Sequence, residues 1–338
     1  MIRILALSDI HSEITAVNLM REQEENNFDA ICVAGDIGPR FVDDIFNILT
    51  TFSCPVYYIY GNIEHNFDFD REFPNGCIML HHRVLENNGY YFTGFNGCTQ
   101  GWGKNPIRKQ LYNRVDSRFP DLIRVINSIH KVRDDIYLKA NQEYKIALKK
   151  LNKKHSNKRS KGYEKGVLSL GKNRYNEYQK FQATDSRIEM DHLKETQQYK
   201  KYATLTCQAT EEFIIQNRTK MFKAIQRTDV PSHRLIIMTH ERQYRMHEEL
   251  EGIKCHLFGH HHGFRHTLYK GTNFVNVSAL DPERSRTYQD YNRAIKGPAD
   301  HNALNLSDIK YWLGTYSIIE LSDEEVTVSM RSVPYENT

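Results

Sequence analysis

Ile2-Arg-Ile-Leu-Ala-Leu-Ser-Asp-Ile-His11 is the stretch that decides the fold of this chain. Its first six residues form an almost continuous apolar run, which is typical of a strand buried on both faces in a parallel sheet. Residues two apart in an extended segment point to the same side, so Asp9 and His11 can reach a common site. The stretch therefore predicts a buried first strand that carries two polar side chains at its carboxyl end.

Strand and helix signals alternate through the first hundred residues. Buried-strand runs recur at Ala30–Ala34 and Val56–Tyr60, with helical apolar spacing at Ile14–Glu25 and Val42–Leu49 between them. Shorter strand signals follow at Cys77–Leu80 and Tyr90–Gly94. The strand pattern returns late in the chain, at Leu235–Met238, Lys254–Phe258, Phe274–Val277, Tyr316–Leu321 and Val326–Met330. This order predicts right-handed βαβ units around a mainly parallel sheet.

The middle of the chain has a different pattern. Apolar residues recur at helical spacing from Leu122 to Leu151, which is about eight turns. A basic turn at Asn152–Gly162 and a second helical stretch from Arg174 to Arg227 follow. We therefore expect a helical hairpin over residues 105–200, inserted into one domain formed by residues 1–104 and 201–338. The polar segment Asp281–Gly314 is long for a loop, and such loops are usually functional or mobile.

Charge is distributed unevenly along the chain. Residues 104–230 hold 29 Lys and Arg against 14 Asp and Glu, whereas the remainder holds 17 against 28. The formal net charge of +4 is the difference between a basic middle segment and an acidic remainder. The two parts therefore face different electrostatic tasks.

Composition also bears on the compartment. The apolar runs are strand-length, and none approaches the roughly 18 residues of a membrane span. The first apolar stretch is too short for a signal peptide and has no cleavage pattern. The six cysteines show no CxxC pair, which favours buried, reduced thiols. A cytoplasmic protein that makes no membrane contact is expected.

Five short polar blocks each follow a predicted strand: Asp9-Ile-His11, Gly35-Asp36, Gly61-Asn62, His240 in Met-Thr-His-Glu, and Gly259-His-His-His262. Ligands of α/β sheets gather at the carboxyl ends of strands, so these blocks can converge. Carboxylates, an amide oxygen and imidazoles, without a thiolate, suit a pair of hard-to-borderline divalent metal ions. Each block alone is weak evidence for a metal site, because a lone histidine is more often an ordinary core or surface residue. Five blocks in order, each at a strand end, leave little room for that alternative.

In these blocks the sequence resembles the calcineurin-like metallophosphoesterase superfamily, whose pattern is D-x-H, GD, GN-(H/x)-(D/E), an isolated His and GH-x-H. The resemblance covers residues 1–103 and about 206–330. It implies an α/β sandwich of mixed β-sheets flanked by helices, with two divalent metal ions that assist hydrolysis of a phosphate ester. Manganese is the first expectation, and iron, zinc and nickel also suit the ligand set. Carried over by position, the resemblance assigns one metal to Asp9, His11 and His262, the other to Asn62, His240 and His260, and a bridging role to Asp36.

The chain departs from the family pattern after Asn62. The family's catalytic histidine is replaced by Ile63, which cannot protonate a leaving group. His65 or His261 is the candidate replacement, and the alternative for His65 is an ordinary surface position. Relatives without that histidine tend to favour phosphodiesters or less demanding substrates.

A second departure follows the fourth block. The family usually continues with prolines, whereas this chain reads Glu241-Arg-Gln-Tyr-Arg245. Arg242 and Arg245 are candidates for contact with a phosphate oxygen. The alternative is that they form surface ion pairs with Glu241 or Glu248.

The basic insertion leaves the substrate open. Lysine and arginine with interleaved tyrosine suit phosphate contacts and base stacking, which favours a nuclease or another phosphodiesterase acting on nucleic acid or nucleotides. The alternative is a small-molecule phosphomonoesterase or cyclic-nucleotide phosphodiesterase, in which the helices form a homo-oligomer. A non-catalytic scaffold is a third hypothesis, which the complete set of ligand types disfavours.

Overall fold

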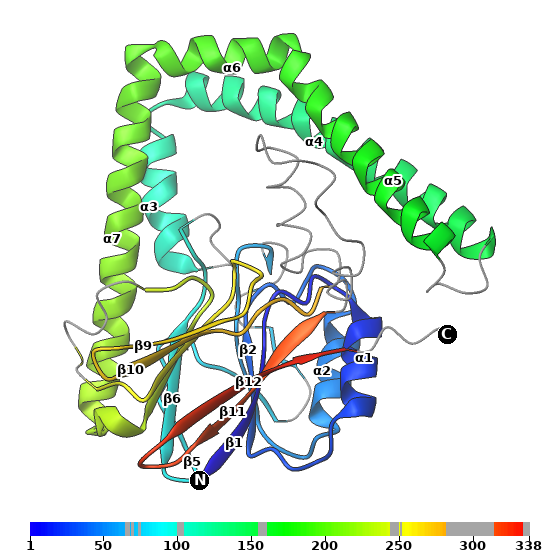
Figure 1. The fold of residues 1–338 in the computed structure, drawn as a ribbon. Coiled ribbons are helices and arrows are strands. Elements are labelled where there is room, and N and C mark those ends of the chain that lie inside the picture. The colour runs from blue at the N-terminus through cyan, green and yellow to red at the C-terminus, as the bar shows by residue number, and fades with distance from the viewer. Residues whose placement is uncertain are drawn as a thin grey trace. The chain divides into compact units, whose positions relative to one another are not determined.

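The structure is a computed structural model, shown as a ribbon in Figure 1. It describes residues 1–64, 68, 71–73, 76–99, 105–154, 161–243, 250, 252–281 and 314–333. The chain divides into two compact units. The first consists of Met1–Lys109 and Glu212–Tyr335, and the second is formed mainly by Gln110–Glu211.

The first unit contains two six-stranded sheets. One has the spatial order β12-β11-β1-β2-β3-β4, with bounds Val326–Ser332, Thr315–Leu321, Ile2–Leu7, Ala30–Ala34, Val56–Ile59 and Cys77–Met79. The other has the order β5-β6-β7-β8-β10-β9, with bounds Leu85–Asn87, Tyr90–Phe95, Leu235–Thr239, Cys255–Phe258, Thr272–Asn276 and Arg265–Tyr269. Four strands in each sheet are parallel neighbours, and the remaining strands pair antiparallel. The predicted mixed-sheet fold is confirmed, although the antiparallel edge strands β5 and β9 were not predicted.

Alternation along β1 explains how the sheets are arranged. Ile4 and Ala6 belong to a buried apolar cluster that also contains Ile236 and Leu257 from the other sheet. The residues that alternate with them, Leu5 and Leu7, belong to a second cluster with side chains from α1 (Ile14–Gln23) and α2 (Val42–Thr50). The first sheet is therefore covered by its partner sheet on one face and by these helices on the other, which accounts for the almost continuous apolar run.

Helices fill the sequence between the two halves of the first unit. Their bounds are α3 Pro106–Asp116, α4 Pro120–Lys154, α5 Lys161–Gln179, α6 Asp185–Glu195 and α7 Gln197–Thr228. The predicted helical insertion is confirmed, and α4 packs along α5 as a hairpin, with the Arg174 guanidinium 4.2 Å from the centre of the Tyr144 ring.

The second helical stretch, predicted from Arg174 to Arg227, is not one continuous helix, because it is interrupted at two threonines. Thr184 is the N-cap of α6 and its hydroxyl accepts from Arg187 N at 3.2 Å. Thr196 has an extended backbone and accepts from Tyr199 N at 3.1 Å. Threonine side chains that satisfy the first amides of a helix favour such restarts.

A buried polar network joins parts of the first unit distant in sequence. The Asn217 carbonyl oxygen accepts from Asn105 Nδ2 at 2.8 Å and lies 3.0 Å from His82 Nε2. The Asn217 amide donates to Phe213 O at 2.7 Å. Asn105 also caps α3, because its Oδ1 accepts from Ile107 N at 3.0 Å. These bonds fix the first turn of α3 against the sheet.

Within the described ranges, every helix is too short or too polar to span a membrane. All six cysteines are free thiols, but the prediction that they are buried holds for Cys32, Cys98 and Cys255 only: Cys54 and Cys77 are half-buried and Cys207 is exposed.

Candidate metal centre

The site is built where loops follow β1, β2, β3, β7 and β8. Main-chain bonds join the first two loops, because Asp9 N donates to Gly35 O at 3.1 Å and His11 N donates to Asp36 O at 3.0 Å. Left-handed backbone recurs at the predicted ligands, with positive φ at Asp9, His11, Asp36, His260 and His262. Such conformations cost energy in residues other than glycine and cluster at functional sites.

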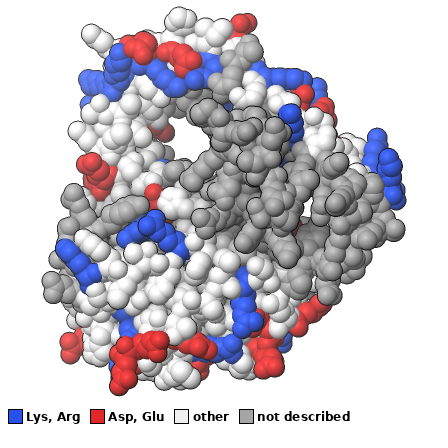
Figure 2. All heavy atoms as spheres, viewed as in Figure 1, with Lys and Arg blue, Asp and Glu red and all other residues white. Residues whose placement is uncertain are grey.

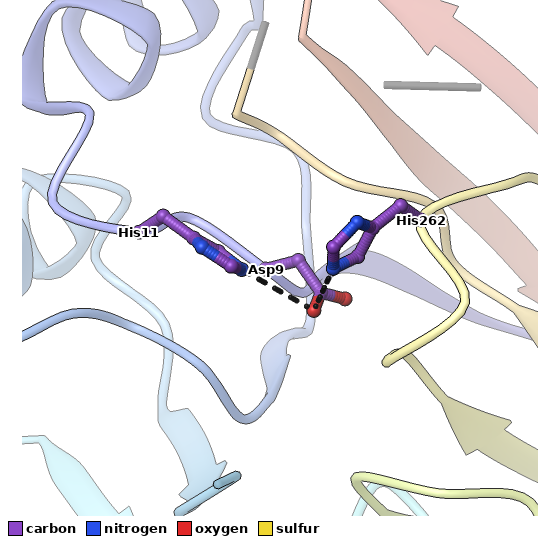
Figure 3. Close-up of side chains that lie close together, drawn as sticks. All are labelled: Asp9, His11 and His262. Carbon is purple, nitrogen blue, oxygen red and sulfur yellow. Dashed lines mark hydrogen bonds and ion pairs between the residues drawn. The ribbon is translucent and has the colours of Figure 1, made fainter. Parts of the chain in front are cut away.

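Asp9 is the centre of a first cluster (Figure 3). Its Oδ1 lies 3.1 Å from His262 Nε2 and 3.5 Å from His11 Nε2, so two imidazoles point at one oxygen. The other oxygen, Oδ2, accepts from the Ser8 hydroxyl at 2.7 Å and from His260 N at 2.9 Å. One oxygen is therefore held by the protein while the other faces the histidines.

The two carboxylate oxygens of Asp36 differ in the same way. Its Oδ1 accepts from Asn62 N at 2.6 Å and from Ile63 N at 3.1 Å. Its Oδ2 lies 3.4 Å from His240 Nε2 and 3.7 Å from His11 Nε2. The free oxygen of Asp36 thus faces histidines from both predicted ligand sets.

Asn62 gathers the remaining ligands. Its Oδ1 lies 3.0 Å from His240 Nε2 and 3.1 Å from His260 Nδ1. The other ring nitrogen of His240 lies 2.8 Å from Ala34 O, to which it donates. This bond fixes the His240 tautomer and leaves Nε2 as the nitrogen that can bind a metal.

Burial and charge act against each other in this cluster. Burial alone would raise the pKa of Asp9, but hydrogen bonds with His11 and His262 hold it well below its usual value. Burial would lower the pKa of His240, but the negative charge of Asp36 raises it well above the ordinary value. The pKa of Asp36 is in turn lowered, against its burial, by the charge of His240. The site is therefore built to hold negative carboxylates and needs positive charge beside them.

The donor set fits two divalent metal ions. Two overlapping groups have ligand atoms within 4.8 Å of one another: Asp9, His11 and His262, and Asp9, Asp36 and His240. Both carboxylates are almost fully buried, and the ion pairs found for them within the described ranges are all with histidines. Buried carboxylates whose ion pairs are with imidazoles, and not with lysine or arginine, suit a metal better than a structural ion pair.

Two glycines leave the room that this packing requires. A methyl group on Gly61 would collide with Asp36 Oδ1 and lie 2.6 Å from Asp36 N. A methyl group on Gly259 would collide with the Ser8 hydroxyl and lie 2.5 Å from Asp9 Oδ2. The glycines in these blocks therefore allow close approach of loops to the ligands.

The structure describes two of the residues that were predicted to act in catalysis, His261 and Arg242. His261 is exposed, and its ring lies 5.4 Å from that of His260. Arg242 lies with its guanidinium 4.3 Å from the centre of the Phe274 ring. His65, Arg245 and the segment between Asp281 and Gly314 lie outside the described residues.

Three supporting residues were missed in the sequence. Glu64 is fully buried and its two oxygens accept from Gly38 N at 3.1 Å and Gly61 N at 2.7 Å. Burial, together with the charge of Asp36, raises the pKa of Glu64 to about 7. Asp281 lies 3.7 Å from His11 Nδ1, and its amide donates to Asp9 O at 3.1 Å.

The third is Ser8, the donor to Asp9. A signal was present for two of them, since Glu64 occupies the acidic position of the GN block and Asp281 is another polar residue soon after a strand.

Residues 2–92 match the family description "Calcineurin-like phosphoesterase superfamily domain". The match places residues 2–92, which contain the first four predicted strands and three of the five polar blocks, in that superfamily. The predicted family is confirmed. No curated protein matches the sequence.

Three solved structures are similar at low scores. A Thermus thermophilus protein, TT1561, is 12% identical with a TM-score of 0.47, over 98% of this chain and 99% of that one. A conserved protein of Streptococcus pneumoniae TIGR4, a predicted phosphoesterase, is 11% identical with a TM-score of 0.34, over 98% and 89%. The phosphopantetheinyl hydrolase PptH of Mycobacterium tuberculosis is 14% identical with a TM-score of 0.34, over 82% and 88%. Similarity this low transfers no substrate to this chain.

Proposed function

We propose that the protein is a hydrolase that uses two divalent metal ions to cleave phosphodiester bonds, in nucleic acid or in nucleotides. The observation that carries the proposal is the paired arrangement of Asp9 and Asp36. Each has one oxygen held by N–H or O–H donors and one oxygen directed at imidazoles. Preorganised carboxylates of this kind suit a fixed metal pair better than a mobile substrate group.

The ligand assignment is the one that the family resemblance implies, and the contacts of Asp9, Asp36 and Asn62 support it. Asp9, His11 and His262 would hold one ion, Asn62, His240 and His260 the other, and Asp36 both. Bound divalent ions supply Lewis-acid polarisation of a phosphoryl oxygen and lower the pKa of water. Manganese is our first choice, and iron, zinc and nickel also suit this donor set.

The side chains around the cluster bear on the type of ester. Ile63 has an aliphatic side chain and supplies no proton to a leaving group. Exposed His261, beside His260, is the described residue that we propose for this role. A set of diesters graded by leaving-group pKa tests it, with His261→Gln beside the wild type. A loss confined to poor leaving groups supports the role, and an equal loss on all esters contradicts it.

Nucleic acid is the partner that the insertion favours. Lys139, Lys145, Lys149, Lys150, Lys153 and Lys154 are all exposed on the second half of α4. Within the described ranges, none of these lysines makes a hydrogen bond or ion pair with a carboxylate. Figure 2 shows basic side chains along the helices of this unit, with acidic ones between them in places. Unpaired lysines along a helix suit a row of phosphates.

Salt dependence tests this partner. Binding of a labelled single strand to the wild type is expected to weaken steeply between 50 and 200 mM salt, at roughly one unit of log–log slope per phosphate contacted. Replacing Lys145, Lys149 and Lys153 by glutamine should reduce that slope by about two to three units. A slope near zero for the wild type would exclude a polyanionic substrate at this surface.

A second candidate is a small-molecule phosphomonoesterase or cyclic-nucleotide phosphodiesterase whose insertion forms a homo-oligomer. Leu138 and Ile146, on the same stretch of α4, are 58% and 57% exposed. Exposed aliphatic side chains of this kind favour association with another protein surface. Light scattering on Leu138→Asp/Ile146→Asp separates the two candidates. A lower mass than the wild type, with no salt-dependent nucleic-acid binding, supports the second.

A further inference from the structure

Glu241 directly follows the predicted ligand His240, yet its carboxylate is directed at another segment. Its Oε2 accepts from Thr99 N at 2.9 Å and from the Thr99 hydroxyl at 2.7 Å. The same hydroxyl lies 2.9 Å from Oε1. The residue after His240 is thus fastened to a position far earlier in the sequence.

A second side chain, that of Arg108, donates hydrogen bonds to main-chain carbonyls of the same segment. Arg108, in the first turn of α3, donates through Nη1 to Cys98 O at 2.9 Å and through Nη2 to Thr99 O at 2.8 Å. Arg108 is 7% exposed. The donors of Thr99 are therefore taken by Glu241, and the carbonyls of Cys98 and Thr99 by Arg108. This arrangement leaves the segment little freedom to shift.

The held segment touches a predicted metal ligand. Cys98 Sγ lies 3.7 Å from Asn62 Oδ1, the atom that faces His240 and His260. Gly97 N donates to Tyr60 O at 2.8 Å, which joins the segment to the strand end just before Asn62. If this segment moved, the side-chain amide of Asn62 would lose its contact with Cys98.

We propose that Glu241 is a positioning residue: through Thr99 it holds Cys98 against Asn62 and so completes the half of the site formed by Asn62, His240 and His260. The inference rests on the proposed function, since it takes these three residues as ligands of one metal ion. Its specific content is that Glu241 acts through hydrogen bonds and not through its charge. It also acts on one metal and leaves the other, held by Asp9, His11 and His262, unchanged.

The test compares Glu241→Ala with Glu241→Gln. Glutamine can accept from Thr99 N through its carbonyl and donate to the Thr99 hydroxyl through its amide, so it preserves the contact without the charge. Manganese binding is measured by equilibrium dialysis, and electron paramagnetic resonance separates coupled pairs from isolated ions. We expect Glu241→Ala to bind the first ion as the wild type does and the second ion 10- to 100-fold more weakly. Glu241→Gln should stay within a few-fold of the wild type.

Two further variants guard against misfolding and general charge effects. Thr99→Val removes the hydroxyl but keeps the amide, and should weaken the second ion by less than Glu241→Ala does. Glu320→Gln removes a carboxylate that pairs with Arg3 on the first sheet and should change neither ion. Two ions bound at wild-type affinity by Glu241→Ala would overturn the inference, as would a glutamine variant as weak as the alanine variant. A wild type that binds fewer than two ions would instead refute the proposed function, and the inference with it.

Discussion

Gly259→Ala is the substitution whose effect the structure specifies most closely. The added methyl group would collide with the Ser8 hydroxyl and lie 2.7 Å from Ser8 Cβ and 2.5 Å from Asp9 Oδ2. Ser8 and Asp9 are both fully buried and cannot move into solvent. Overpacking of this kind costs about 1–3 kcal/mol. Weakening the bonds that Asp9 Oδ2 accepts would add about 1 kcal/mol each.

The same collision should weaken metal binding. Asp9 Oδ2 is fixed by the Ser8 hydroxyl and by His260 N, and displacement of this oxygen turns Oδ1 away from the imidazoles. Loss of such supporting contacts usually costs 10- to 100-fold in metal affinity. Urea unfolding of the metal-free protein and manganese titration of the folded protein measure the two effects separately.

Gly171→Ala is the matched control. Gly171 lies inside α5, and a methyl group there meets nothing within 4 Å. Alanine is favoured over glycine in a helix by about 0.8–1 kcal/mol, so this variant should be slightly more stable and bind manganese as the wild type does. If Gly259→Ala matched Gly171→Ala in both measurements, the packing described around Asp9 would be wrong.

Three further outcomes are expected. Glu64→Gln leaves one of two loop amides without its acceptor and should lower the free energy of unfolding by about 1–3 kcal/mol in thermal denaturation; unchanged stability would contradict the hydrogen bonds of Glu64. Asn217→Leu removes the acceptor of the buried Asn105 amide and of the half-buried His82 ring, and should cost at least about 1–3 kcal/mol, measured by calorimetry; a neutral effect would argue against the network. The pKa of His256 is lowered to about 3 by burial and then by the charge of Arg242. In the unfolded chain His256 therefore binds a proton below pH about 6.5, whereas in the folded chain it binds the proton only below pH about 3. Stability should fall as pH decreases through that window, by up to about 1.4 kcal/mol per pH unit, in urea unfolding. His256→Phe should flatten this slope and exposed His266→Gln should not; an equal slope in all three would refute the assignment.

The core strands and the polar blocks were predictable because burial on two faces leaves a distinctive pattern. β1 is apolar except for Arg3 and β2 is wholly apolar, and a single residue separates each strand from the predicted ligand Asp9 or Asp36. Long-range convergence at the sheet's carboxyl edge then follows from topology. The contact of Asp36 with both His11 and His240 is the outcome of that rule.

Features that depend on tertiary packing were not predictable from local pattern. β9 is largely exposed along its length, so it lacks the apolar signal of an inner strand. The role of Glu64 depends on two glycine amides that only the folded loops bring together. The contact of Glu241 with Thr99 joins residues 142 positions apart, and no spacing rule reaches that far.

In the proposed function, a metal pair at Asp9, Asp36 and their histidines cleaves phosphodiesters. The most direct measurement is hydrolysis of bis-p-nitrophenyl phosphate against manganese concentration, with p-nitrophenyl phosphate beside it, for the wild type and Asp36→Asn. Asparagine keeps the oxygen that accepts from Asn62 and Ile63 but replaces the oxygen that faces His11 and His240. We predict manganese-dependent cleavage of the diester in preference to the monoester, lost by at least 100-fold in a folded Asp36→Asn (on the order of the upper cost of disturbing a metal site). Diester cleavage that needs no added or bound metal, or that survives Asp36→Asn, would refute the proposed function.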